Sequence, residues 1–437
     1  MIKVEDVFGV SVKQVKSYIE REQVDNKFIE ALKSDKQIIV YGSSKQGKTA
    51  LVKKYIDYDD NIVISLSPKH TLKDIYQTIL RKSGITLRTS YTKGSGQSST
   101  AKGKARIQGA IALVLKGTAE VGLDRSTNHS STENYDEIEF NLELPDDVAD
   151  IINRHGNKKV VILENFHYLS EEVQKDFAYD LRTFQELKVR FVIVGVWKES
   201  NRLSQFNGEL QDRIDEIPVE PWTNEDFLRI IAKGEQELNI KFATTIKHLC
   251  LDNSFASVGV FQELLRLTCI NFGIFNRGDN AFIDSEDSFN KALAEKTNDY
   301  SERHLKNLEA IASGNNTQVQ KDKPLPFFMH YYIVTDILSQ GYDAIKNGGM
   351  TKLCMMHSIK QKHHRSNDLR GGHLTTALKG LVELQSNKSI NPPVIAYDAT
   401  SKKIKVVDST FYFFLKNADL DDVIDEITNP IEALELI

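Results

Sequence analysis

Residues 38–49 read Ile-Ile-Val-Tyr-Gly-Ser-Ser-Lys-Gln-Gly-Lys-Thr. Within them, Gly42, Gly47, Lys48 and Thr49 match the phosphate-loop pattern G-x-x-x-x-G-K-[ST]. An apolar, β-prone run precedes the loop, and a helix-compatible run, residues 50–55, follows it. Glycines let a backbone approach phosphate closely, and the amides of a helix N-terminus attract an anion. The stretch therefore predicts a strand, a nucleotide-binding loop and a helix.

Two side chains of this loop have specific expected roles. Lys48 is expected to reach the β- and γ-phosphates of ATP, and the hydroxyl of Thr49 to ligate Mg²⁺. A Gly-rich turn without a ligand is the alternative, which the strand–loop–helix context disfavours. The residues expected to contact the nucleotide are Gly42, Ser43, Ser44, Lys45, Gln46, Gly47, Lys48, Thr49 and Ala50.

Length and composition indicate an ordinary globular protein. The chain has 437 residues, 40% of them hydrophobic, and a net charge of −5, which suits about two to four domains. It has no apolar run long enough to span a membrane, and its first residues lack the apolar core of a secretory signal. The cysteines, Cys250, Cys269 and Cys354, form neither a metal pattern nor a disulfide framework. We therefore expect a cytoplasmic protein without a membrane partner.

The region after the lead-in alternates strand and helix. Apolar strands are expected at 37–41, 61–65, 159–163, 190–196 and 214–219, and amphipathic helices at 48–56, 71–83, 146–155 and 171–187. Such alternation predicts an α/β fold, a P-loop NTPase with a parallel sheet sandwiched by helices. This core is assigned to residues 36–220, after an N-terminal helical lead-in, residues 1–35, with helices expected over 11–33.

Residues 88–145 interrupt the alternation and are interpreted as an insertion. Their first part is rich in Gly, Ser, Thr and Lys, and residues 105–123 fit either a β-hairpin or a short helix. A subunit contact, a DNA-contacting loop, a membrane-touching patch and a solvated excursion without a ligand all remain open.

Beyond residue 220 the pattern becomes helical. Helices at 223–236, 243–251, 258–271 and 284–310 predict an all-helical lid over 221–315, followed by a polar linker with two prolines. Residues 327–416 then show helices at 327–340, 348–361 and 373–385 and two short strands within 395–408. Three helices with a β-hairpin predict a winged-helix domain. Residues 417–437 form an acidic tail.

A second half of the nucleotide site follows the strand Val160–Leu163. Glu164 stands at the end of this strand, where an ATPase holds Mg²⁺ with a carboxylate. Asn165 stands next to it, where a catalytic acid is usual. An amide can orient water but cannot accept its proton. The alternative is a buried strand that simply ends in polar residues.

On these motifs the chain resembles the AAA+ and STAND branch of P-loop ATPases, in particular the prokaryotic relatives of replication-initiator ATPases. The resemblance covers about residues 18–300 and 327–416. It places the segment 18–21 near the adenine, with an ordinary helix end as the alternative for Arg21. It also implies a polar sensor after the fourth strand, for which Glu199 and Asn201 are the candidates.

The resemblance further implies an arginine that acts on the nucleotide of a neighbouring subunit. Arg213 fits this catalytic role better than Arg202, although an ion pair of Arg213 with Asp215 or Glu216 is equally consistent with the sequence. Where the lid of the family carries an arginine, this chain has Gln262. Together with Asn165, this departure predicts a slow ATP hydrolase.

The resulting hypothesis is a nucleotide-dependent conformational switch that controls DNA binding or assembly, as a homo-oligomer or with a separate effector protein. Stand-alone ATPases of this kind often belong to phage-defence or mobile-element systems. Two alternatives are a DNA-binding module resembling a replication or transposition helper, and a protein-interaction scaffold with a nearly inert ATPase.

DNA contact is suggested by the charge of residues 343–405, which hold eleven Lys or Arg against four Asp or Glu. Basic residues of a recognition helix and wing are what phosphate contacts need, but solvated charges and protein docking are alternatives. His363, His364 and His373 interleave with them without the spacing of a zinc site. The basic residues are Lys360, Lys362, Arg365, Arg370, Lys379, Lys402, Lys403 and Lys405.

Overall fold

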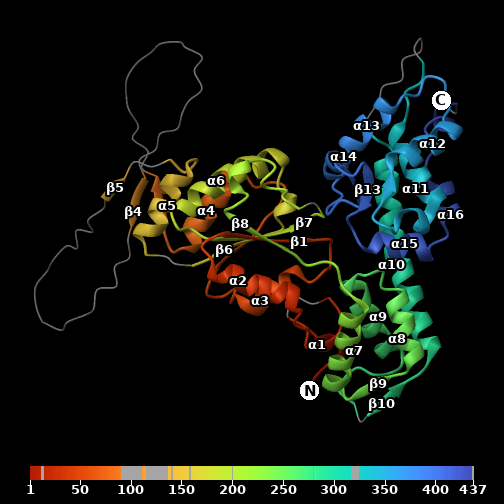
Figure 1. The fold of residues 1–437 in the computed structure, drawn as a ribbon, viewed down its shortest axis with the longest axis horizontal. Coiled ribbons are helices and arrows are strands. Elements are labelled where there is room, and N and C mark those ends of the chain that lie inside the picture. Colours follow the sequence, from red (N-terminus) through yellow and green to blue (C-terminus); the bar gives the residue numbers. More distant parts are fainter. Residues whose placement is uncertain are drawn as a thin grey trace, which may run out of the picture.

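The computed structural model describes residues 1–10, 14–89, 111–114, 136–138, 141–156, 159–198, 200–278, 280–315 and 324–435. Figure 1 shows three parts: an α/β core, a helical part and a C-terminal part, with the long helix α10 (Glu286–Ala312) running from the second into the third.

The core is a five-stranded, all-parallel sheet in the order β2-β6-β7-β1-β8. Helices α2 (Lys27–Lys33) and α3 (Lys48–Tyr55) pack on one face, and α4 (Leu72–Lys82), α5 (Pro145–Arg154) and α6 (Glu171–Glu186) pack on the other. The predicted α/β P-loop fold is confirmed. The strands are β1 (Gln37–Gly42), β2 (Ile62–Ser65), β6 (Val161–Glu164), β7 (Phe191–Val196) and β8 (Ile214–Pro218).

The insertion contributes a second sheet. Strands β3 (Thr86–Thr89), β4 (Ile111–Val114) and β5 (Asp136–Ile138) pair antiparallel in that order. Strand β4 lies within 105–123, where either a hairpin or a helix had been expected. Residues 90–110, 115–135, 139 and 140 of the insertion lie outside the described residues, and the role of the insertion stays a prediction.

The N-terminal residues differ from the expected helical lead-in. Within the described part of 11–33, helix is confined to the π-helical turn η1 (Glu22–Asn26) and α2, and residues 14–21 are not helical. Ahead of them, α1 (Val4–Val7) packs its buried Val4 and Val7 against α7 and α9 of the helical part. Burial explains the position of α1, since Val4 and Val7 complete the apolar core of the helical part.

The helical part contains α7 (Asn224–Leu238), α8 (Thr244–Asp252), α9 (Val258–Asn271) and the first half of α10. The expectation of an all-helical lid was incomplete. Strands β9 (Ile240–Phe242) and β10 (Ala281–Ile283) pair in parallel beside the helices and bury Ile240, Phe242 and Ile283.

In the C-terminal part, α11 (Met329–Ile345) leads into a three-stranded antiparallel sheet in the order β11-β13-β12. The expected third helix is two helices that meet at Gly380. This order of elements is the one that the winged-helix hypothesis requires, and the classification itself stays a prediction. The other elements up to residue 406 are β11 (Met350–Thr351), α12 (Lys352–Lys362), α13 (Gly371–Lys379), α14 (Leu381–Asn387), β12 (Ile395–Asp398) and β13 (Lys403–Val406).

The segment expected as an acidic tail is folded over much of its length. Within it, α16 (Leu420–Glu426) packs on α11 with Val423 buried. The preceding helix, α15 (Thr410–Asn417), packs on α10 and belongs almost wholly to the segment expected as a winged helix. A short helix, α17 (Glu432–Glu435), follows. Acidic residues face water while the interspersed apolar ones join the core, which the charge count alone did not reveal.

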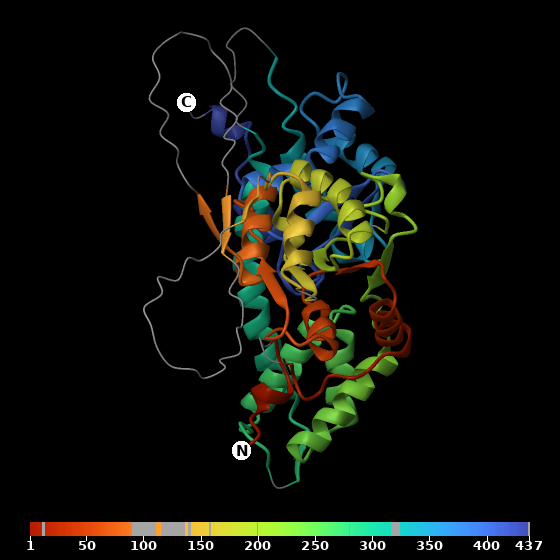
Figure 2. The ribbon, with the colours of Figure 1, turned by 90° about the vertical axis from the view of Figure 1, so that its left-hand side faces the viewer.

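Helices α10 and α15 pack together and join the helical and C-terminal parts. Figure 2 shows the C-terminal part above the helical part, with the core in front. Phe413 of α15 belongs to the apolar cluster of the helical part, with its ring 5.3 Å from that of Tyr300 and 5.9 Å from that of Phe255. Among the described residues, no helix is long and apolar enough to cross a membrane.

Candidate functional site

The phosphate loop joins β1 to α3 at the carboxyl end of the sheet. Gly42 and Gly47 have φ of +152° and +81°, a region that side chains disfavour. A Cβ on Gly42 would lie 2.7 Å from Cγ2 of Val219, so the loop can pass the end of β8 only with glycine here. The pattern recognised in the sequence therefore corresponds to a tight turn at the N-terminus of α3.

Lys48 lies inside this turn. Its buried ammonium donates to the backbone carbonyls of Gly42, at 3.0 Å, and Ser43. Burial lowers the pKa of Lys48 to about 8, against the opposing effect of the carboxylates of Glu220 and Glu164. A buried cation with few fixed anions around it is suited to receive a phosphate.

Thr49 and Glu164, the two residues expected to hold Mg²⁺, are in contact. The Thr49 hydroxyl donates to Oε2 of Glu164 at 3.1 Å, and Tyr58 donates to Oε1. The hydroxyl oxygen of Thr49 and the carboxylate oxygen of Glu164 are of the type that Mg²⁺ prefers. Mg²⁺ commonly takes its other ligands from phosphate and water. Over the described ranges, no cluster of three or more His, Cys, Asp or Glu forms a separate metal site. The residues fit a magnesium ion held jointly with a nucleotide.

Asn165 lies beside Glu164 with a left-handed φ of +62°, and its amide donates to the Ser65 hydroxyl at 3.1 Å. Two residues further on, His167 has no hydrogen-bond partner on either ring nitrogen within the described part of the chain. Burial, together with the charges of Lys48 and Arg202, lowers its pKa to about 3. The site therefore contains a neutral imidazole to which the sequence assigned no role.

Arg213 is not part of this site in its own chain. Its guanidinium donates to Gln185 at 3.0 Å and pairs with Glu186 at 3.1 Å, both on α6. The ion-pair partner is thus Glu186, where the sequence had suggested Asp215 or Glu216. The carbonyl of Arg213 accepts from Gln37 at the start of β1, the end of the strand far from the loop. An action on a neighbouring subunit stays a prediction.

The sensor candidates have different outcomes. The backbone amide of Asn201 donates to Glu216 at 2.8 Å, and Glu199 lies outside the described residues. Arg202 lies over the Trp197 ring and donates to Gln174 on α6 at 3.3 Å. The sensor role of Glu199 or Asn201 and an action of Arg202 on a neighbouring subunit stay predictions.

Gln262 and Arg21 tie the N-terminal segment to its surroundings. The Gln262 carbonyl accepts from the Gly9 amide at 3.3 Å, and its amide donates to Ser17 at 2.9 Å. Arg21 lies 3.6 Å from the centre of the Trp222 ring and donates to the Val219 carbonyl at 2.9 Å. Gln262 therefore fixes the segment before β1 and does not point at the loop.

Other parts of the chain bind the outer turn of the phosphate loop, residues 43–46. Glu220, at the hinge between core and helical part, accepts from the Ser43 amide at 2.6 Å. The Gly259 amide at the start of α9 donates to the Lys45 carbonyl at 3.0 Å, and a Cβ on Gly259 would come within 2.8 Å of that oxygen. The side chain of Gln46 donates to the Ala256 carbonyl at 3.3 Å.

A cavity of about 440 Å³ adjoins this turn, a size suited to a small ligand. The core, the helical part and the C-terminal part all contribute to its walls. Aromatic rings, a carboxylate and an amide line it, which would suit the base and sugar of a nucleotide. Representative lining residues are Gln46, Glu220, Trp222, Phe255, Tyr342 and Tyr412.

The C-terminal basic residues are only partly free for a ligand. Arg365 pairs with Asp368 at 2.8 Å and donates to the Leu325 carbonyl at 2.7 Å, and Lys405 pairs with Asp398 at 2.6 Å. Rings of His363 and His364 bind carbonyls of residues 327 and 326. The residues that remain exposed are Lys360, Lys362, Arg370, Lys379 and Lys402.

Comparisons with known proteins give a family match for the core. Residues 31–203 match the family model described as an AAA domain. No curated protein matches the chain.

Solved structures give more distant likenesses. The ORC2 protein of Aeropyrum pernix is 12% identical with a TM-score of 0.44, covering 100% of both chains. The Walker-type ATPase PABY2304 of Pyrococcus abyssi is 15% identical (TM-score 0.42), covering 91% of this chain and 96% of its own. The RuvB branch migration motor of Thermotoga maritima is 13% identical (TM-score 0.38), covering 91% and 95%. Because these TM-scores lie below 0.5, no residue role is transferred from these structures.

Proposed function

We propose that the chain, whose residues 31–203 match the AAA domain model, binds ATP with Mg²⁺ at residues 42–50 and hydrolyses it slowly as a nucleotide-dependent switch. The proposal rests on one observation above the others. The Thr49 hydroxyl and the Glu164 carboxylate meet 3.1 Å apart beside the buried ammonium of Lys48. A cation, a carboxylate and a hydroxyl at a helix N-terminus are what a triphosphate and its metal require.

The roles of the individual residues follow from their chemistry. Lys48 would bind the terminal phosphates, and Thr49 and Glu164 would hold Mg²⁺, which neutralises phosphate charge when bound. Asn165 would orient the attacking water through its amide but cannot take its proton. Because the imidazole of His167 is neutral at physiological pH, it adds no positive charge beside the phosphates. Slow turnover is the expected result.

The test is to measure the affinity for a fluorescent ATP analogue and the steady-state ATP hydrolysis of the wild type and of Lys48→Ala. We expect the variant to lose binding, with turnover reduced to background. Lys33→Ala, which changes an exposed lysine at the end of α2, serves as a control and should bind the analogue as the wild type does. Equal analogue affinity in wild type and Lys48→Ala would contradict the assignment.

A second candidate function is duplex DNA binding by the C-terminal part. It is favoured by the exposed basic side chains of α12 and of the turn between β12 and β13, in particular Lys360, Lys362 and Lys402. Their replacement by Gln should weaken duplex binding and reduce its salt dependence. Replacement of Lys306, an exposed lysine of α10, is the control. Salt-independent or undetectable DNA binding would instead favour a protein partner.

Steady-state ATP hydrolysis measured with and without duplex DNA identifies the output of the switch. DNA-stimulated hydrolysis that disappears in Lys48→Ala would support coupling between the C-terminal part and the nucleotide site. Turnover indifferent to DNA would favour assembly, either with a second copy or with a separate effector. A role in phage defence or mobile-element biology rests on the sequence resemblance and stays a prediction.

A further inference from the structure

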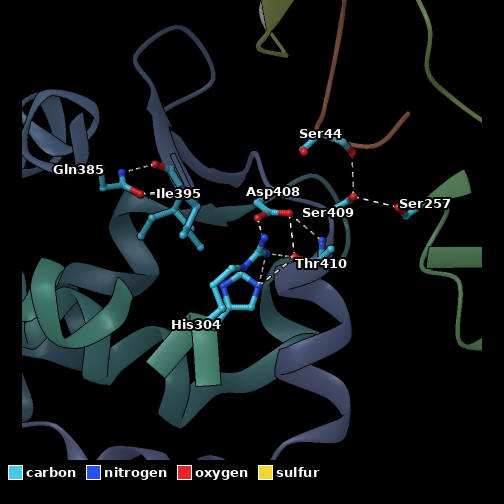
Figure 3. Close-up of polar contacts among 10 residues, drawn as sticks. Ser44, Ser257, His304, Gln385, Ile395, Asp408, Ser409 and Thr410 are labelled. Carbon is cyan, nitrogen blue, oxygen red and sulfur yellow. Dashed lines mark hydrogen bonds and ion pairs between the residues drawn. The ribbon is translucent and has the colours of Figure 1, made fainter. Parts of the chain in front are cut away.

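Two buried hydroxyls and a backbone carbonyl connect the helical part, the C-terminal part and the phosphate loop in one chain of hydrogen bonds (Figure 3). The Ser409 hydroxyl donates to the Ser44 carbonyl at 3.1 Å. Its oxygen lies 2.9 Å from that of Ser257, the residue before α9. With Ser257 donating to Ser409, every hydroxyl proton has an acceptor. Ser409 thus forms hydrogen bonds with both the loop and the helical part.

The position of Ser409 is fixed by its neighbours on either side. The buried carboxylate of Asp408 accepts from Arg303 of α10 at 2.6 Å and from the Thr410 hydroxyl and amide at 2.8 and 3.1 Å. The Thr410 hydroxyl also lies 3.0 Å from the ring of His304 (Figure 3). We call residues 408–412 the corner segment. It is held rigidly against α10, so it can position a hydroxyl on the loop.

The corner segment also lines the cavity beside the loop. Ser409 and Tyr412 contribute to its wall together with Gln46 and Trp222. Lys45, within the loop, extends its ammonium over the Tyr300 ring of α10, 5.1 Å from the ring centre. The loop is therefore contacted at its backbone by Ser409 of the C-terminal part and at the Lys45 side chain by Tyr300 of the helical part, and both parts line the cavity beside it.

We propose that the corner segment holds the phosphate loop in a form of reduced nucleotide affinity, so that ATP binding and docking of the C-terminal part oppose each other. This inference rests on the proposed nucleotide site. In the docked form, Lys48 donates to the carbonyls of Gly42 and Ser43 in its own loop. Ser409 donates to the next carbonyl, that of Ser44, and holds it in place. A phosphate needs the Lys48 ammonium, so the loop must release it. By linkage, each event weakens the other by the same factor.

The first test removes the hydroxyl. Ser409→Ala should tighten binding of a fluorescent ATP analogue by about 2- to 10-fold, the effect of one hydrogen bond. Ser386→Ala, which changes an exposed serine of α14, is the matched control and should bind as the wild type does. Unchanged or weaker binding in Ser409→Ala would overturn the inference.

The second test measures docking directly. In a Cys354→Ser background, Ser257→Cys with Ser409→Cys places two thiols where the hydroxyl oxygens lie 2.9 Å apart. The other cysteines, Cys250 and Cys269, are buried. We expect disulfide formation on mild oxidation, slowed at least about threefold by the ATP analogue, a coupling within the usual range. Adding Lys48→Ala should remove this nucleotide effect.

The outcomes separate the inference from the proposed function. Analogue binding without any change in the rate of disulfide formation would overturn the inference and leave the nucleotide site intact. Absence of the disulfide would show that the corner segment does not dock and would also overturn it. Absence of analogue binding to the wild type would overturn both.

Discussion

The Thr49 hydroxyl donates to the Glu164 carboxylate at 3.1 Å although 115 residues separate them in the chain. The carboxyl ends of β1 and β6 lie at the same edge of the parallel sheet, and this edge brings the two residues together. Tyr58 donates to the second carboxylate oxygen. Glu164 is therefore oriented before any ligand arrives, which lowers the cost of organising the site during turnover.

Glu164→Gln should lower the rate of ATP hydrolysis by about 100-fold or more, because it removes the charge that would hold Mg²⁺ while keeping the shape. Nucleotide affinity should change far less, because Lys48 remains. Steady-state hydrolysis and analogue titration at several Mg²⁺ concentrations measure the two effects. Tyr58→Phe, which keeps the carboxylate, should cost only a few-fold. Equal hydrolysis by Glu164→Gln and wild type would contradict the role.

The parts of the site that could be predicted share a physical property: their signal is local in the sequence. Gly42 ends one strand, Gly47 and Lys48 follow it, and Glu164 ends another strand, so the parallel sheet alone brings them together. Tyr58 could not be predicted. It follows α3 with no pattern of its own, and only its packing places the phenol at Glu164.

Asn165→Asp should increase hydrolysis about tenfold or more, because a carboxylate beside the nucleotide could accept the proton of the attacking water. The present amide donates to Ser65, whose hydroxyl could in turn donate to an aspartate at this place. Single-turnover hydrolysis measures the chemical step. Asn165→Ala is the comparison and should be no faster than the wild type. A slower Asn165→Asp variant would indicate that the amide itself assists the reaction.

The affinity for ATP should fall as the pH rises above about 8. Burial lowers the pKa of Lys48 to about 8 in the free protein, and a bound phosphate would raise it by its negative charge. The dissociation constant should be nearly constant below pH 7 and then increase by up to about tenfold per pH unit. Titration of a fluorescent ATP analogue from pH 6.5 to 9.5 measures this.

The matched control is Lys48→Arg, whose guanidinium stays charged over this range. If this variant binds the analogue, its affinity should not depend on pH in the same way. A wild-type dissociation constant that is flat to pH 9.5 would show that Lys48 is not the titrating group.

Long-range contacts account for most of what the sequence did not reveal. Glu220, Gly259 and Ser409 bind consecutive residues of the loop, yet they follow it by 177 to 365 residues. No local periodicity encodes such contacts, since they depend on how the three parts pack. The same holds for Gln262, which was compared with a lid arginine and instead binds the N-terminal segment.

Asp408→Asn should lower the stability of the docked C-terminal part at neutral pH by about 1.5–3 kcal/mol, the usual contribution of hydrogen bonds to a charged group. Arg303 and the Thr410 hydrogen bonds outweigh burial and hold the pKa of the Asp408 carboxyl below its usual value. A depressed carboxyl pKa stabilises the fold above the unfolded-state pKa of about 4, and this contribution is lost as the pH falls through the folded-state pKa. The difference in unfolding free energy between variant and wild type should therefore shrink below about pH 4.

Thermal unfolding between pH 3 and 7 measures this difference. Asp287→Asn, which changes an exposed pair with Lys291, is the control and is expected to change stability little. A difference that stays constant down to pH 3 would mean that the charge of Asp408 does not stabilise the corner segment.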